Sequence, residues 1–261
     1  YKLSYSDYGV EELVTAGVKN AKKAAADCGK DTAVALDVGP IGELMEPNGA
    51  LKYEDAYDMF KEMMVAGEKA GADLIVSHHP VIFSPLKRLD TGSIPYRLAG
   101  AGIAAICVHT NLDRAAGGVG DLLAVRLELD DIQTAADGIC RIGRPTEPRS
   151  PRDFAAFVGK RLGTPVRLRA GTGPVKRVAV CGGAGGDFLL PLLKEGGADT
   201  AVTGELKHHE WLALPPGVTV VEAGHYHTEA CMTEGMARWL REAFPQAEVT
   251  AFEDEPPYVT V

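Results

Sequence analysis

Five residues of this sequence have the side-chain types and spacing of a site for divalent metal ions. His78 and His79 are adjacent, and Asp113 and Glu229 each lie four residues after another histidine. Neutral imidazole nitrogen and carboxylate oxygen are ordinary ligands of Zn, Mn, Fe and Ni. The sequence therefore predicts a centre for two divalent ions of open identity, with the ligands His78, His79, Asp113, His225 and Glu229.

The order of these residues also indicates how they could share two ions. Adjacent residues that leave a strand point to opposite sides, so His78 and His79 can serve different ions. If a helix begins at His225, Glu229 lies on the same face of that helix and could bridge two cations with its two oxygens. A bridged pair about 3.5–4 Å apart is typical of hydrolytic two-metal enzymes. A lone histidine is more often structural, so the prediction depends on the clusters occurring together.

The elements that must position these residues follow an alternating pattern. Short apolar runs that end in turn residues alternate with amphipathic stretches, which predicts an α/β protein with helix-covered sheets. Six of the seven histidines follow predicted strands, where ligands of α/β sheets collect. The predicted strands are 32–38, 73–77, 103–108, 177–181, 200–203 and 218–222, and the predicted helices are 53–70, 153–162, 188–194 and 228–244.

The chain divides by pattern into two similar, intimately packed α/β lobes. A connector rich in Gly, Pro and Arg (138–152) separates a first lobe (1–137) from a second (153–261). In each lobe a Gly-Ala-Asp step precedes a strand that ends in polar residues, and a later strand delivers a histidine followed four residues on by a carboxylate. Short α/β units can resemble each other by chance, but two matches in the same order favour an internal duplication.

Composition excludes several classes of protein. With 261 residues, 46% apolar, the chain is long enough for a sizeable core. Its net charge of −9 disfavours nucleic-acid binding, which needs clustered Lys and Arg. No run approaches the roughly 20 apolar residues of a membrane span, so we expect a cytoplasmic protein without a membrane partner. The five cysteines form no CxxC pair, which predicts reduced thiols rather than disulfides or a thiolate zinc site.

Further polar residues near the predicted strand ends have open roles. Glu205, His208 and His209 are candidates for general acid-base catalysis, although Glu205 could simply begin a helix. His109 is interpreted as a ligand of occasional use or as a hydrogen-bond partner of Asp113. The glycine-rich loop 181–187 (CGGAGGD) could cradle a phosphate or could serve only for tight packing.

Four longer motifs resemble a known family. They are GADLIVSHHPVIFSPLKRL (71–89), HTNLDRAAGGVGDLLA (109–124), GADTAVTGELKHHEWLAL (197–214) and EAGHYHTEA (222–230). Together they are similar to the Nif-three-like dinuclear metal-centre proteins, some of which carry the name type-two GTP cyclohydrolase. Family members usually have a tryptophan-containing WDNVGL-like segment near the start, and residues 5–30 show none.

This resemblance implies a two-lobed α/β fold, a homohexameric ring and a two-metal centre facing its cavity. It implies that His79 and Asp113 hold one ion, that His78 and His225 hold the other, and that Glu229 bridges them. The function expected from it is a metal-dependent hydrolase of a small phosphorylated or nucleotide-like substrate, in the manner of a GTP cyclohydrolase. The alternative is a metal-binding ring that regulates or adapts other proteins without catalysis.

Overall fold

The computed structural model describes residues 10–27, 34–38, 71–83 and 86–252, which fall into two compact units. The first unit joins Tyr1–His109 to Thr233–Val259, and the second contains Thr110–Met232. Helices alternate with strands in both, which confirms the predicted α/β class. The predicted helix 53–70 lies outside the described residues.

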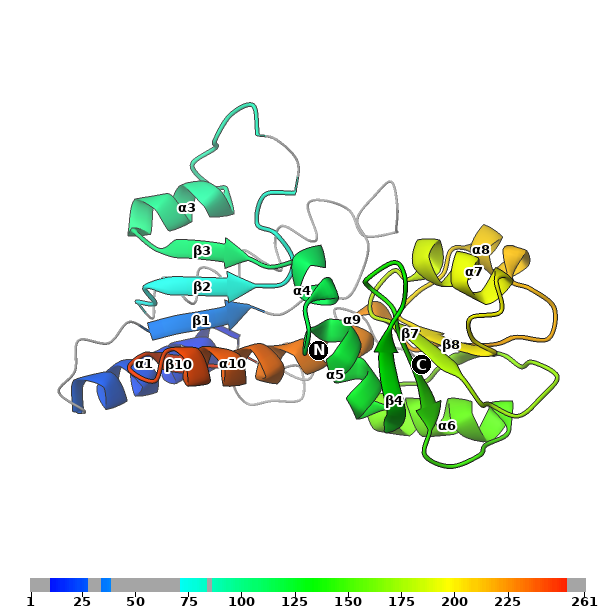
Figure 1. Ribbon diagram of the computed structural model, residues 1–261. Coiled ribbons are helices and arrows are strands. Elements are labelled where there is room, and N and C mark those ends of the chain that lie inside the picture. The colour runs from blue at the N-terminus through cyan, green and yellow to red at the C-terminus, as the bar shows by residue number, and fades with distance from the viewer. Residues whose placement is uncertain (1–9, 28–33, 39–70, 84–85, 253–261) are drawn as a thin grey trace. The chain divides into compact units, whose positions relative to one another are not determined.

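A parallel four-stranded sheet forms the centre of the first unit. Its strands follow the order β10-β1-β2-β3, and β2 lies between β1 and β3 (Figure 1). Helix α3 ends where Gly102 adopts a left-handed φ of 70°, and this turn leads directly into β3. The bounds are β1 Val34–Val38, β2 Leu74–Ser77, β3 Ala104–Cys107, β10 Glu248–Thr250, α1 Val10–Asp27 and α3 Ile94–Ala101.

A mixed six-stranded sheet forms the centre of the second unit, in the order β4-β5-β7-β8-β9-β6. Strands β7, β8 and β9 are parallel, whereas β4, β5 and β6 pair antiparallel with their neighbours. The central strands β7 and β8 are buried along their whole length, as is typical of parallel strands covered by helices on both faces. The bounds are β4 Leu129–Thr134, β5 Arg141–Pro145, β6 Arg167–Arg169, β7 Val178–Cys181, β8 Thr200–Thr203 and β9 Thr219–Glu222.

Helices cover both faces of this sheet. Alternate residues of β7 enter different cores: Val178 and Val180 pack with α5 and α6, and Ala179 and Cys181 pack with α7 and α8. Because both faces of the sheet are packed, the carboxyl ends of the strands are held in place, and so are the residues that follow them. The helix bounds are α4 Thr110–Arg114, α5 Val119–Arg126, α6 Pro151–Leu162, α7 Gly186–Lys194, α8 His208–Ala213 and α9 His225–Glu229; α10, Cys231–Ala243, continues from α9 toward β10.

The compact units differ from the lobes expected from the sequence. Residues 141–145 of the expected connector form β5 inside the second sheet, because their backbone pairs with both β4 and β7. The C-terminal β10 pairs with β1 and therefore belongs to the first unit. An internal duplication stays a prediction, with which the parallel triplets β1-β2-β3 and β7-β8-β9 are consistent.

The described cysteines are free thiols, as expected; Cys28 lies outside the described residues. Cys140 and Cys181 are buried neighbours, and the hydrogen bond between them, together with burial, raises the pKa of Cys140 far above its ordinary value. Burial likewise raises the pKa of Cys231 to about 12. Cys140 and Cys231 therefore stay protonated at neutral pH.

Among the helices that the structure describes, none has both the length and the apolar character needed to span a membrane.

Candidate functional site

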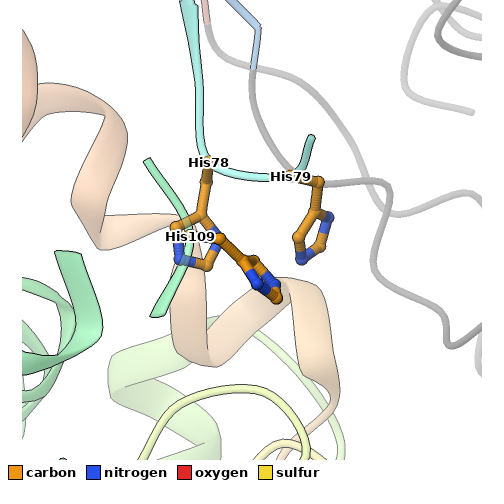
Figure 2. A group of neighbouring side chains, drawn as sticks. All are labelled: His78, His79 and His109. Atoms are coloured by element: carbon orange, nitrogen blue, oxygen red, sulfur yellow. The ribbon is translucent and has the colours of Figure 1, made fainter. Parts of the chain in front are cut away.

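Three histidines gather at the carboxyl ends of β2 and β3 in the first unit (Figure 2). Their ring centroids are 5.1 Å apart for His78 and His79, 5.2 Å for His78 and His109, and 5.3 Å for His79 and His109. One nitrogen of each ring lies within 4.8 Å of the others. His78 is fully buried and the other two rings are half-buried. This arrangement offers three neutral nitrogen donors to a single cation.

The cluster also shows how the adjacent histidines are arranged. Strand β2 ends at Ser77, so the alternation of a strand no longer applies to His78 and His79, and their rings lie near each other. The Ser77 hydroxyl donates to the carbonyl oxygen of His79 at 2.9 Å and lies 3.3 Å from the thiol of Cys107. The Val81 amide also donates to that thiol, at 3.5 Å. These contacts hold the turn after β2 against the end of β3.

A second cluster lies in the second unit, where β9 leads into α9. His225 and Glu229 lie one helical turn apart, both are buried, and Nε2 of the histidine is 3.2 Å from Oε1 of the glutamate. The sequence placed the start of the helix at residue 228, and the structure begins α9 earlier, at His225. On the other side of the ring, Nδ1 of His225 lies 2.9 Å from Oε1 of Glu205. Glu205 follows β8, so two neighbouring parallel strands supply the three side chains.

The two carboxylates control the charge of this histidine. Burial alone lowers the pKa of His225, because it penalises the imidazolium, but Glu229 and Glu205 outweigh it and raise the pKa to about 10. The site thus attracts positive charge strongly. A divalent cation on Nε2 would replace that proton and satisfy the same carboxylate, so the donor set fits a metal ion.

The glycine-rich loop 181–187 packs against this second cluster. Gly183 has a φ of +61°, and a Cβ there would overlap Oε1 of Glu229 and come within 2.9 Å of Nε2 of His225. The amides of Gly183 and Gly185 donate to the hydroxyls of Thr228 and Thr203, at 3.0 and 3.1 Å. Because these two amides already donate hydrogen bonds within the protein, the packing interpretation of the loop is favoured over a phosphate cradle.

A buried arginine holds the turn that follows Asp113. The side chain of Arg141 is 1% exposed, and its Nε donates to Oδ1 of Asp121 at 2.6 Å. Its Nη2 donates to the carbonyl oxygens of Arg114 and Ala115, at 3.2 and 3.0 Å. These carbonyls lie at the end of α4, the helix that carries Asp113. Arg141 therefore fixes the position of the half-buried Asp113 within the second unit.

Comparison with known proteins places this chain in a family. The model of the Duf34/NIF3 family (NGG1p interacting factor 3) matches residues 55–257. The chain belongs to the DUF34/NIF3 family. A second model, that of homocysteine S-methyltransferase, matches residues 1–79, which is less than a third of the chain. The expected resemblance is thus confirmed. Residues 5–30, which show no WDNVGL-like segment, lie within the range that the homocysteine S-methyltransferase model matches.

Relatives and solved structures agree with this assignment. A Lactococcus lactis protein named GTP cyclohydrolase 1 type 2 homolog is 34% identical over 76% of this chain and 81% of its own length. The NGG1-interacting factor 3 of Saccharomyces cerevisiae is 29% identical over 75% of this chain and 76% of its own. A Bacillus cereus protein related to NIF3 has the same fold, with a TM-score of 0.69 at 20% identity, covering 89% of this chain and 90% of its own.

In this DUF34/NIF3 protein the predicted metal ligands are distributed over both units. His78 and His79 lie together in the first unit, with His109 beside them. His225 and Glu229 lie together in the second, which also contains Asp113. The union of the two sets in one dinuclear centre stays a prediction.

The predicted catalytic residues of this family member have different surroundings. Glu205 contacts His225, whereas His208 and His209 are exposed on the first turn of α8. Within the described part of the chain, neither of these two histidines makes a hydrogen bond or ion pair. A catalytic role for Glu205 and His209 stays a prediction.

Sequence reasoning missed Arg141 and Glu210, both buried. Glu210 accepts from the amide of Lys207 at 2.6 Å and lies against Gly186, at the start of α7. The signal for Arg141 was present, because a single arginine within the apolar run ICRI indicates a buried, fully bonded guanidinium.

Proposed function

We propose that this DUF34/NIF3 protein is a metal-dependent hydrolase with a dinuclear centre, acting on a small phosphorylated or nucleotide-like substrate. The observation that carries the proposal is the presence of two clusters of metal-ligating side chains, three imidazoles in the first unit and one imidazole with two carboxylates in the second, each at the carboxyl ends of neighbouring parallel strands. Relatives named GTP cyclohydrolase 1 type 2 homolog support a nucleotide substrate and hydrolytic chemistry.

The proposed ligand sets follow the family motifs. His79 and Asp113 would hold one ion, His78 and His225 the second, and Glu229 would bridge them. Two bridged divalent ions supply Lewis-acid activation of water and of a substrate oxygen. The metal identity is open, because imidazole and carboxylate suit Zn, Mn, Fe and Ni alike.

The surrounding residues would prepare this site before a substrate binds. Glu205 accepts from Nδ1 of His225 and so directs Nε2 toward Glu229, as carboxylates do behind metal-binding histidines. Gly183 leaves space for the Glu229 carboxylate, which a side chain would displace. His209 would exchange protons with the substrate as an acid or base.

Hydrolysis by metal-loaded protein tests the proposal. The full chain is loaded with Zn, Mn, Fe or Ni in turn and incubated with nucleoside triphosphates, including GTP, and with small phosphoesters. We expect two ions per chain and metal-dependent turnover that His225→Ala abolishes. A preparation that contains two ions and hydrolyses no member of the panel with any metal would refute the enzyme.

The second candidate is a non-catalytic metal-binding protein that regulates or adapts other proteins. It is favoured by the name of the yeast relative, NGG1-interacting factor 3. His209→Ala separates the two functions: an enzyme that uses this imidazole loses turnover and keeps its metals, whereas an adaptor keeps both its metals and its partners.

A homohexamer and a cytoplasmic location are part of either proposal. Light scattering that gives six times the 27.7 kDa chain mass supports the ring, and a monomer mass refutes it.

A further inference from the structure

Cys140 and Cys181 face each other across two antiparallel strands of the second unit. The pairing of β5 with β7 places Arg141 opposite Val180, so the next residues along, Cys140 and Cys181, are also opposite each other. Both side chains belong to the core beside α7 and α8, and both are buried. A hydrogen bond joins the two thiols. The two sulfur atoms are therefore in direct contact.

The backbone gives this pair the spacing of a cross-strand disulfide. The carbonyl oxygen of Cys140 accepts from the Ala135 amide at 2.9 Å, and its own amide donates to the Asp137 carboxylate at 2.8 Å. Both groups thus point toward the β4–β5 hairpin and away from β7, which makes Cys140 and Cys181 a non-hydrogen-bonded pair. The Cα atoms of such pairs are about 4.5 Å apart, within the range of about 4.4–6.8 Å that disulfides span. An S–S bond can therefore form without a large movement of either strand.

The glycine-rich loop connects this pair to the second cluster. Cys181 begins the loop 181–187, in which Gly183 lies against the Glu229 carboxylate. The loop also folds back over the thiol, since a Cβ on Gly185 would lie 3.1 Å from Sγ of Cys181. A movement of this sulfur therefore displaces the loop that leaves space for Glu229.

We propose that Cys140 and Cys181 are a redox pair: a peroxide oxidises them to a disulfide, and the disulfide weakens metal binding at the second cluster. The inference rests on the proposed function, since it gives the metal centre of that function a means of regulation. An S–S bond of about 2.05 Å is much shorter than a hydrogen-bond contact between two sulfur atoms. Its formation draws Cys181 toward β5 and away from the rest of the loop.

The oxidation is a two-electron reaction that releases two water molecules. The hydrogen bond raises the pKa of Cys140, which identifies this thiol as the donor and Cys181 as the acceptor. The Cys181 sulfur therefore attacks the peroxide: the O–O bond breaks, and a sulfenic acid and one water form. The Cys140 sulfur then attacks the sulfenic sulfur and loses its proton, the S–S bond forms, and the hydroxyl leaves as the second water. Because both thiols are buried, the reaction requires a local opening of the loop and should be slower than that of an exposed thiol.

Treatment of the metal-free full chain with hydrogen peroxide tests the pair. After denaturation and alkylation, the treated protein should take up three alkyl groups, against five for the reduced protein, and peptide mapping should find Cys140 linked to Cys181. Competition titration with a chromophoric chelator then gives the Zn²⁺ affinity of both forms. We expect oxidation to weaken Zn²⁺ binding about 10- to 100-fold, as the loss of a supporting contact does, and dithiothreitol to restore it.

Two variants separate this pair from the other thiols. Cys140→Ala/Cys181→Ala keeps the remaining three cysteines and should bind Zn²⁺ as the reduced protein does, both before and after peroxide treatment. The single variant Cys140→Ala removes the partner of Cys181 and should likewise form no disulfide, which provides the same comparison if the double variant does not fold. Circular dichroism of the metal-free proteins checks the folding of each. A loss of Zn²⁺ affinity on oxidation of these variants, equal to that of the unaltered chain, would refute the role of the pair.

The failure of this inference differs from that of the proposed function. If peroxide oxidises the half-buried Cys107 while Cys140 and Cys181 keep their thiols, the redox pair is refuted. If the disulfide forms and the Zn²⁺ affinity does not change, the regulation is refuted and the dinuclear centre is unaffected. If oxidation weakens Zn²⁺ binding in a chain that hydrolyses no substrate, the hydrolase is refuted and the redox pair stands.

Discussion

Replacing Gly183 by alanine tests how closely the glycine-rich loop fits the second cluster. An added methyl group meets two obstacles. The backbone has a φ of +61°, which L-residues adopt at a cost of about 1–2 kcal/mol. The Cβ would also overlap Oε1 of Glu229, so the carboxylate or the loop must move by about 1 Å to reach ordinary van der Waals contact.

The second obstacle should reduce metal binding specifically. Displacement of a ligand or its support by this amount weakens metal affinity about 10- to 100-fold, which corresponds to about 1.4–2.8 kcal/mol. Gly196→Ala is the matched control, because Gly196 has a φ of +73° and open space around its Cβ position. Both variants should lose about 1–2 kcal/mol of unfolding free energy from backbone strain. Only Gly183→Ala should also lose metal affinity.

Two measurements distinguish these contributions. Urea unfolding of the metal-free proteins gives the strain of each variant, and competition titration with a chromophoric chelator gives the affinity for Zn²⁺. Equal affinities of the two variants would refute the reasoning, because they would mean that Glu229 either does not bind metal or adapts freely to the methyl group. A loss in both variants would show that strain alone disturbs the site.

Two further predictions concern buried charges. Arg141→Met should destabilise the protein by about 3–5 kcal/mol in urea unfolding, because it leaves Asp121 and the carbonyl oxygens of Arg114 and Ala115 without their buried donor. The control Arg144→Met removes an exposed ion pair and should cost at most about 1 kcal/mol of unfolding free energy. Equal losses in the two variants would contradict this account. Burial raises the pKa of Glu222 above 4.5, against the opposing effect of Arg167, so the folded state binds this proton more tightly and loses stability as the pH rises from 4.5 through the raised pKa. Glu222→Gln should therefore become more stable relative to the unaltered protein as the pH rises through this window, and a constant difference across pH would exclude the effect.

The parts that sequence predicted best are those that depend on local pattern. Both bounds of β8, Thr200–Thr203, were predicted, because a short buried run flanked by Asp and Gly has few alternatives. The four-residue spacing from His225 to Glu229 suits one face of a helix, and the structure has a helix over these residues. The side chains that a strand end presents could thus be named before the sheet was known.

Features that depend on distant pairing could not be predicted in this way. Strand β5 has the composition of a connector, yet it pairs on both sides, and its Arg141 is buried because carbonyl oxygens and Asp121 satisfy the guanidinium. Strand β10 is short and half-buried, and only its pairing with β1 defines it. His109 could not be ranked either, because its distance from His78 and His79 depends on the register of β2 and β3.

The pairing of β1 with β10 also affects the order in which the chain folds as it is synthesised. Val34 pairs with Glu248, so the first sheet cannot close until the segment that contains Glu248 has left the ribosome, and the edge of β1 that pairs with β10 stays open until then. The second unit is continuous from Thr110 to Met232 and can complete its sheet earlier. The unit that comes second in the sequence is therefore the one expected to fold first, and the three histidines of the first unit reach their final positions last.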